Sequence, residues 1–130
     1  MKRLLLLLLV LSLQTALAQK EDRKVIFELR TKCMQMAKEE CAGSSGVPES
    51  FYNVKRNRCY AICRFYTDSS EVTNLWDVQT GKNVASAFRG FTKHIEDVTK
   101  DRGYIGEKYV GLDSALAYIE KMTTEEIDKK

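Results

Sequence analysis

Four cysteines, Cys33, Cys41, Cys59 and Cys63, are the residues whose type and spacing carry the clearest chemistry. An even number of cysteines in a chain bound for an oxidising compartment predicts two disulfides. Four cysteines allow three pairings, so the choice depends on the elements that hold them. A zinc site is the competing use. The sequence has one histidine and no C-x₂-C motif, so the usual spacing of zinc ligands is missing.

Catalytic chemistry has little support in the sequence. His94 is the only histidine, and the periodicity around it places it away from the neighbouring apolar stripe. A catalytic histidine works beside a nucleophile or an acid, and no residue at a recognisable spacing supplies one. The sequence also lacks the G-x-S-x-G, H-E-x-x-H and phosphate-binding glycine motifs. We therefore expect no enzyme activity, no cofactor and no metal site.

Residues 1–18 have the pattern of a secretory signal peptide. Met1-Lys2-Arg3 is basic, the stretch from Leu4 to Leu13 is apolar, and Ala16-Leu17-Ala18 is a small-x-small cleavage site. The apolar stretch is shorter than a transmembrane helix needs, and no later stretch reaches that length. The sequence predicts a secreted, extracellular protein without a membrane span, in which residues 19–130 form one domain.

The charge balance excludes two classes of partner. Without Lys2 and Arg3, the 21 basic residues fall to 19, against 18 acidic residues. Such a balance gives no reason to expect binding to nucleic acid or to an anionic membrane.

The elements that position the cysteines are predicted to be helices. Residues 21–41 place apolar side chains at steps of three and four, and the same reasoning predicts helices over about 54–66, 84–100 and 113–122. Residues 47–52 are predicted to be a short connector with a turn at about 48–53, and residues 77–83 a turn in which Gly81 has a positive φ. Pro48 is the only proline, and no long stretch alternates in polarity, which favours helices over strands. The predicted fold class is all-α, a compact bundle of five to six short helices stapled by two disulfides. The stripe of the first helix comprises Val25, Ile26, Leu29, Cys33, Met36, Ala37 and Cys41.

Helix geometry favours one pairing of the cysteines. A bridge from Cys33 to Cys41 would span about 12 Å along a helix, beyond the reach of a disulfide. A bridge from Cys59 to Cys63 would be poorly oriented within a regular helix. Between antiparallel helices the nested pairing Cys33–Cys63 and Cys41–Cys59 fits best. The fit is imperfect, because the rise between cysteines is about 12 Å on one helix and about 6 Å on the other.

The cysteine spacing resembles that of the insect odorant-binding protein superfamily, closest to the salivary relatives of blood-feeding flies. The strings Arg30–Met34, Cys59–Cys63, Leu75–Asp77 and Thr80–Lys82 are also similar to it. The resemblance covers about residues 25–100 and implies an all-helical fold and a Cys33–Cys63 bridge. The last three cysteines of that family are absent here, and Cys41 is additional. Insect chemosensory proteins, which have four cysteines at similar spacings, are the second resemblance.

Both families imply a secreted carrier of a small hydrophobic or amphipathic ligand, such as an odorant, pheromone, lipid mediator or biogenic amine. This hypothesis predicts a cavity of a few hundred Å³. The alternative is a secreted helical effector that acts by contact with a receptor or another protein and has no small-molecule ligand. An exposed apolar patch well above a few hundred Å² would favour the alternative. The candidate lining residues of the cavity are Met36, Tyr66, Trp76, Phe88 and Phe91.

Overall fold

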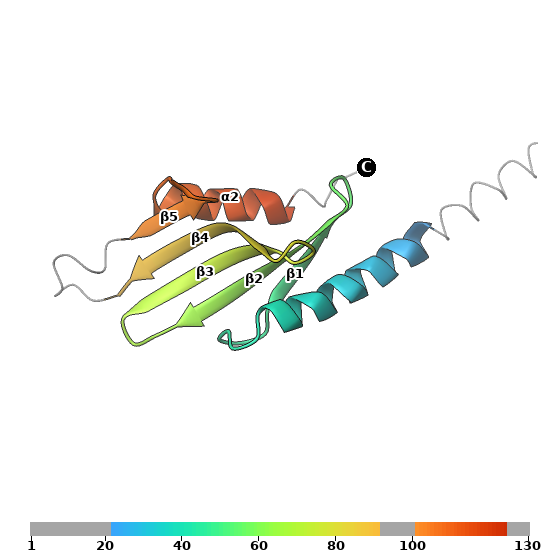
Figure 1. Cartoon of the computed structure of the whole chain (residues 1–130), viewed down its shortest axis with the longest axis horizontal. Coiled ribbons are helices and arrows are strands. Elements are labelled where there is room, and N and C mark those ends of the chain that lie inside the picture. The colour runs from blue at the N-terminus through green and yellow to red at the C-terminus, as the bar shows by residue number, and fades with distance from the viewer. Residues whose placement is uncertain (1–21, 92–100, 125–130) are drawn as a thin grey trace, which may run out of the picture.

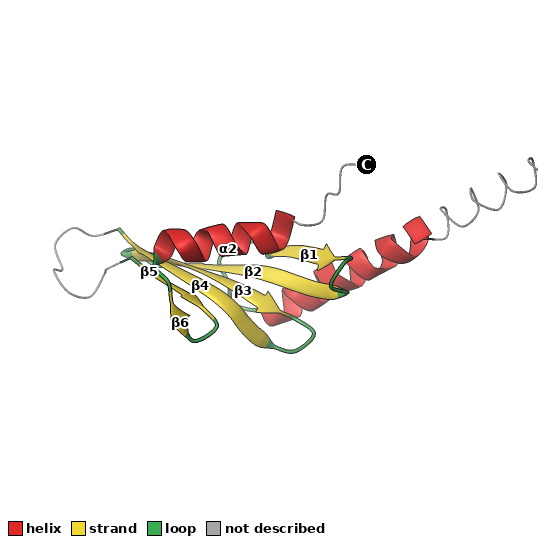
Figure 2. Ribbon diagram, turned by 90° about the horizontal axis from the view of Figure 1, so that it is seen from above, coloured by secondary structure: helices red, strands yellow, loops and turns green. Residues whose placement is uncertain are grey.

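The computed structural model describes residues 22–91 and 101–124. In this part of the chain two helices flank a six-stranded antiparallel sheet, in which the strands follow one another in chain order (Figure 1). The N-terminal helix (residues 22–40) and α2 lie on opposite faces of the sheet (Figure 2). The all-α fold class is therefore wrong. The elements are β1 (Glu49–Asn53), β2 (Arg58–Tyr66), β3 (Ser70–Asp77), β4 (Lys82–Gly90), β5 (Arg102–Ile105), β6 (Lys108–Tyr109) and α2 (Leu112–Thr124).

The first and last predicted helices are confirmed. The N-terminal helix covers residues 22–40 and buries Cys33 and Ala37 on its apolar stripe. Helix α2 buries Ala115, Ile119 and Met122. The predicted signal peptide at residues 1–18 lies outside the described residues.

The predicted helix over 54–66 is wrong, because this stretch forms the strand β2. Cys59, Ala61 and Cys63 contribute to the core under the N-terminal helix, whereas Tyr60 and Ile62 contribute to the core under α2. A strand that is covered on both faces is a continuous apolar run, which periodicity cannot distinguish from a buried helix.

The predicted helix over 84–100 is also wrong in its described part, which belongs to β4. Ala85 and Ala87 are buried under α2, and Phe88 pairs with Val72 of β3. The predicted turn before it is confirmed, because Gly81 has a positive φ of 63° in the β3–β4 connection. His94 lies outside the described residues.

The sheet separates two hydrophobic cores. Gly103 of β5 belongs to the α2 side, where a Cβ atom at this position would lie 1.9 Å from the carbonyl oxygen of Gly111 and 2.6 Å from Cβ of Ala115. Glycine is therefore required where α2 begins. The buried residues of the helix-side core are Cys33, Ala37, Cys41, Tyr52, Cys59, Ala61, Cys63 and Val78. Those of the α2-side core are Tyr60, Ile62, Leu75, Ala85, Ala87, Ala115, Ile119 and Met122.

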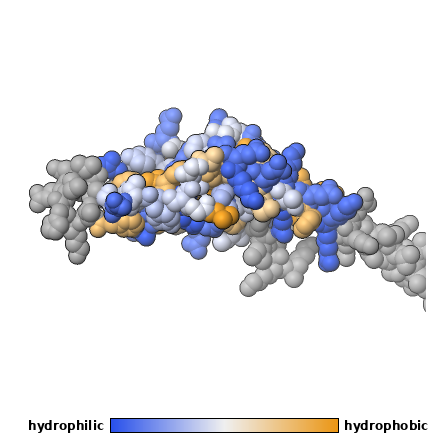
Figure 3. All heavy atoms as spheres, turned by 90° about the horizontal axis from the view of Figure 1, so that it is seen from below, coloured by the Kyte–Doolittle hydropathy of each residue, from blue (hydrophilic) through white to orange (hydrophobic). Residues whose placement is uncertain are grey.

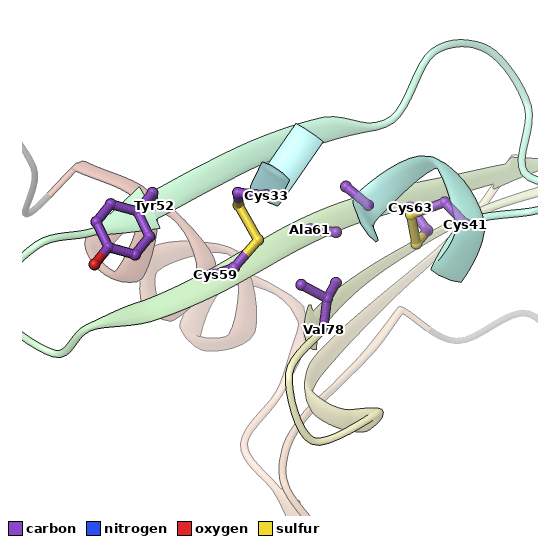
Figure 4. Packing of buried hydrophobic residues seen from close by; sticks show 8 residues of the cluster. Cys33, Cys41, Tyr52, Cys59, Ala61, Cys63 and Val78 are labelled. Carbon is purple, nitrogen blue, oxygen red and sulfur yellow. A yellow bond between two sulfur atoms is a disulfide. The ribbon is translucent and has the colours of Figure 1, made fainter. Parts of the chain in front are cut away.

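The four cysteines form two disulfides, as predicted, but the predicted nested pairing is wrong. The first bridge joins Cys33 to Cys59, with Cα atoms 5.5 Å apart, and the second joins Cys41 to Cys63, with Cα atoms 5.3 Å apart (Figure 4). The cysteines are separated by about 12 Å on the helix and by about 13 Å on a strand. The two separations match, so the helix runs in the same direction as β2 and its second half has a bridge at each end.

Candidate functional site

The first half of the N-terminal helix projects beyond the body of the sheet (Figure 1). The two bridges hold the second half, where Cys33 and Ala37 are buried. In the projecting half the side chains of Val25 and Phe27 are 49% and 71% exposed. Apolar side chains on an amphipathic helix normally pack on a core. The projecting half, residues 22–31, therefore exposes apolar side chains to solvent.

A groove separates this helix from the edge strand β1. Phe27, Arg30, Thr31 and Met34 follow one another at helical spacing and therefore share one side of the helix. With Ser50 and Tyr52 of β1 they line a groove of about 330 Å³ that is open to solvent. We call it the β1 groove. Its walls combine apolar side chains, hydroxyl groups and one cation.

The outer edge of β1 has free main-chain groups. β1 pairs with β2 on one side and is the first strand of the sheet. Its residue Tyr52 lies opposite Cys59, whose N–H donates to the side chain of Gln79 and whose carbonyl accepts from Val78 N–H. These bonds direct the main chain of Cys59 away from β1. In an antiparallel ladder the main-chain groups of Tyr52, and by alternation those of Ser50, therefore point outward.

Among the described residues, the only charged side chain of the β1 groove is a cation. Among the residues that line it, Arg30 is charged and none is a carboxylate. The acidic residues next to the groove in sequence are Glu28, near Arg30, and Glu49, beside Ser50. Each forms an ion pair elsewhere, Glu28 with Lys24 at 4.0 Å and Glu49 with Arg64. Within the described residues Arg30 has no ion pair, so its charge is available to an acidic group of a partner.

A second groove lies along the opposite flank of the same helix. It has a volume of about 250 Å³ and is lined by Leu29, Lys32, Met36, Gln79 and the first bridge. Tyr52 lines both this groove and the β1 groove. The hydroxyl of Tyr52 donates to Oδ1 of Asn57 at 2.5 Å, which fixes the ring beneath the helix.

A third groove, of about 370 Å³, lies between α2 and the sheet. Its apolar residues include Phe51 and Ile62, and its carboxylates are Glu49, Glu71 and Glu120. The ion-paired hydrogen bond that Arg64 donates to Glu49 raises the pKa of the Arg64 guanidinium, so this cation neutralises part of the acidic rim. Glu71 is paired with Arg89 at 3.9 Å, so among the described residues Glu120 is the carboxylate of this groove that has no ion pair. One such carboxylate beside an apolar floor would suit an amphipathic cation.

Two groups on the α2 face, Tyr60 and Arg64, have a raised pKa. Burial raises the pKa of Tyr60, although the nearby cation of Arg56 opposes this shift. The pKa of Arg64 is raised as well. Tyr60 therefore stays protonated and Arg64 stays charged near pH 7.

The five predicted ligand residues lie in different surroundings. Met36 lines the second groove, and Trp76 packs against the helix-side core. Phe88 is half-buried in β4. Tyr66 and Phe91 are 51% and 50% exposed. Their common role in one cavity stays a prediction.

The residues of the β1 groove were missed from the sequence. Phe27, Arg30 and Met34 are visible as a second stripe on a helix that was predicted. The other wall was not visible, because β1 was interpreted as a short connector with a turn at residues 48–53. A groove between a helix and a strand requires both elements.

Comparison of the chain with models of known protein families finds no match, and comparisons with curated proteins and with solved structures find no significant match. The resemblance to the odorant-binding superfamily stays a prediction, whereas the all-helical fold that it implied is wrong. Within residues 22–91 and 101–124 no helix is long and apolar enough to cross a membrane. The same residues contain no cluster of three histidine, cysteine or acidic side chains for a metal ion.

Proposed function

We propose that this protein is a secreted recognition protein that binds another protein through residues 22–31 and the β1 groove. The observation that carries the proposal is the exposure of Phe27 on a helix that two disulfides fix to the sheet. A rigid element that presents apolar side chains loses little conformational entropy on binding. Secretion is supported by the two disulfides and by the signal-peptide pattern of residues 1–18.

The large exposed apolar patch that would favour a protein contact is not seen on the face shown in Figure 3, so the proposal does not rest on patch size. On the face shown in Figure 3 the hydrophobic residues form small separate patches among hydrophilic ones. A large flat interface would need a broader apolar core. The exposed side chains of Phe27 and Met34 instead flank a narrow groove, which suits a segment of a partner.

Photocrosslinking from the helix tests this proposal. A benzophenone amino acid replaces Phe27 in one variant and Gln35, which lies outside the β1 groove, in a second variant. We expect one extracellular protein to be captured from position 27 and not from position 35. With that protein purified, Phe27→Asp should weaken binding at least tenfold without lowering the unfolding midpoint, because the side chain is 71% exposed. Equal binding by the wild type and Phe27→Asp would refute the proposal.

A second candidate function is the carriage of a small amphipathic cation in the α2-side groove. The observation that favours it is the combination of the apolar residues Phe51 and Ile62 with the carboxylate of Glu120. A volume of about 370 Å³ lies within the range of small-molecule sites. The two candidates use opposite faces of the sheet, so substitutions on one face separate them.

A further inference from the structure

We propose that the β1 groove binds an extended segment of the partner, which adds to the outer edge of β1 as a further strand. The segment carries an apolar, an acidic and an apolar side chain at alternate positions. This inference rests on the proposed function and deepens it, since it names the chemistry of the partner at the same site.

The main chain of β1 supplies the template. The N–H and C=O groups of Ser50 and Tyr52 point outward, and no described residue hydrogen-bonds to them across that edge. Strand addition gains affinity from such main-chain bonds, and side chains at alternate positions give it specificity. The five residues of β1 measure about 16 Å, which limits the added strand to a similar length.

The helix supplies the side-chain contacts. Ser50 and Tyr52 line the groove from its β1 wall, so alternate side chains of an added strand would point to the same face, toward Phe27 and Met34. Those two residues are about 10 Å apart along the helix. Positions i and i+4 of a strand are about 13 Å apart. Because the two bridges align the helix with β2, and β2 is antiparallel to β1, the helix runs alongside the added strand.

Arg30 determines the charge of the segment. It lies between Phe27 and Met34 in the helix and has no ion pair within the described residues. A carboxylate at position i+2 of the segment would lie between the two apolar side chains and opposite the guanidinium. An ion pair between a guanidinium and a carboxylate in a partly closed groove adds specificity to the apolar contacts.

A second copy of the chain is a poorer occupant of this edge. A two-fold contact presents the same patch from both copies. The groove contains Arg30 and no carboxylate, so a symmetric pairing of two β1 edges would bring cations together. The charge complementarity therefore favours a different, acidic segment.

The first test uses fluorescein-labelled, capped peptides in which threonine alternates with valine, glutamate and valine. We expect one peptide to bind per chain, and we expect replacement of the glutamate by lysine to weaken binding at least tenfold. The variant Arg30→Glu should reverse this preference. The matched control Lys32→Glu makes the same charge change on the opposite flank of the same helix and should leave both affinities unchanged.

The second test addresses the main-chain bonds. Ser50→Pro removes an outward N–H, and proline is tolerated at such positions of edge strands. We expect the variant to keep its unfolding midpoint and to lose peptide binding at least tenfold. Methylation of alternate peptide amides should abolish binding in one register and spare it in the other.

Several results would overturn strand addition. In the peptide assay they are no binding at millimolar concentration, equal affinity of the wild type for the glutamate and lysine peptides, or unchanged binding by Ser50→Pro. A wild-type dimer that Ser50→Pro dissociates would also overturn it, because a second copy would then occupy the edge of β1. The captured partner distinguishes this failure from failure of the proposed function. If Phe27→Asp weakens the complex but Ser50→Pro does not, strand addition is wrong and the proposed function stands. If neither variant weakens it, the proposed function is wrong too.

Discussion

At the scale of single residues, Gly103 sets the distance between β5 and the first turn of α2. It is a buried strand residue whose carbonyl accepts hydrogen bonds from the N–H groups of Val110 and Gly111. A methyl group here would meet main-chain atoms, which cannot rotate away as a flexible side chain can. The residue therefore fixes how closely α2 packs on the sheet.

The substitution Gly103→Ala is expected to lower the free energy of unfolding by about 2 kcal/mol or more, because overpacked sites of this kind typically cost 1–3 kcal/mol. Urea unfolding followed by tryptophan fluorescence measures the loss. The control is Arg102→Ala, one residue earlier in β5 and exposed, which should change the midpoint little. Equal midpoints for the two variants would show that α2 can shift to accept the methyl group.

At the scale of elements, the two disulfides make the N-terminal helix part of the fold. This helix and the residue that follows it contribute only three buried residues, Cys33, Ala37 and Cys41, to the helix-side core. The bridges close loops with sequence separations of 26 and 22 residues. In the chain-entropy model each such bridge stabilises the folded state by about 3–4 kcal/mol. Without them the projecting half of the helix would lose its fixed orientation.

The connectivity can be tested by mapping the disulfides of the non-reduced protein. Trypsin cleaves after Lys38, which separates the two helix cysteines, and chymotrypsin cleaves after Tyr60, which separates the two strand cysteines. We expect the fragment with Cys33 to remain bound to the fragment that ends at Tyr60. Recovery of Cys33 with Cys63 instead would indicate the nested pairing and would require a different arrangement of helix and sheet. Blocking free thiols before digestion controls for exchange.

At the scale of the whole molecule, the two faces of the sheet carry different grooves. The face under the N-terminal helix leads to the open β1 groove, and the face under α2 leads to the acidic groove of about 370 Å³. The proposed binding of a protein would use the first groove, and the second candidate function, carriage of a cation, would use the second groove. The two functions can be distinguished by whether the secreted protein retains a small molecule.

A native mass spectrum of the protein as secreted should show a single chain without a bound small molecule, with the mass of two disulfides. If a cationic molecule of a few hundred daltons is retained instead, the second candidate function gains support. Glu120→Gln should then release that molecule, because Glu120 lies on the α2 side of the rim. Arg30→Glu, on the helix at the opposite face of the sheet, is the control and should retain it.

The spacing of apolar residues predicted the N-terminal helix correctly and predicted a helix wrongly where β2 lies. The stripe with Cys33 and Ala37 indicated a helix and was confirmed, because one face of that helix is exposed and the repeat is visible. A spacing of four residues, as between Cys59 and Cys63, places side chains on one face in a helix and equally in a strand. Only the even-numbered residues between them, Tyr60 and Ile62, could separate the two cases. Here they are apolar too, because α2 covers the other face of β2.

By itself the sequence determined the two terminal helices, the turn at Gly81 and the formation of two disulfides, because each depends on local spacing, backbone freedom or cysteine count. The sheet, the register of the bridges and the β1 groove were decided by tertiary structure. Strand pairing joins residues that are distant in the chain, and the match of about 12 Å on a helix to about 13 Å on a strand exists only once both elements have formed. The β1 groove has the same origin, since Phe27 and Ser50 come together only when the bridges place the helix beside β1.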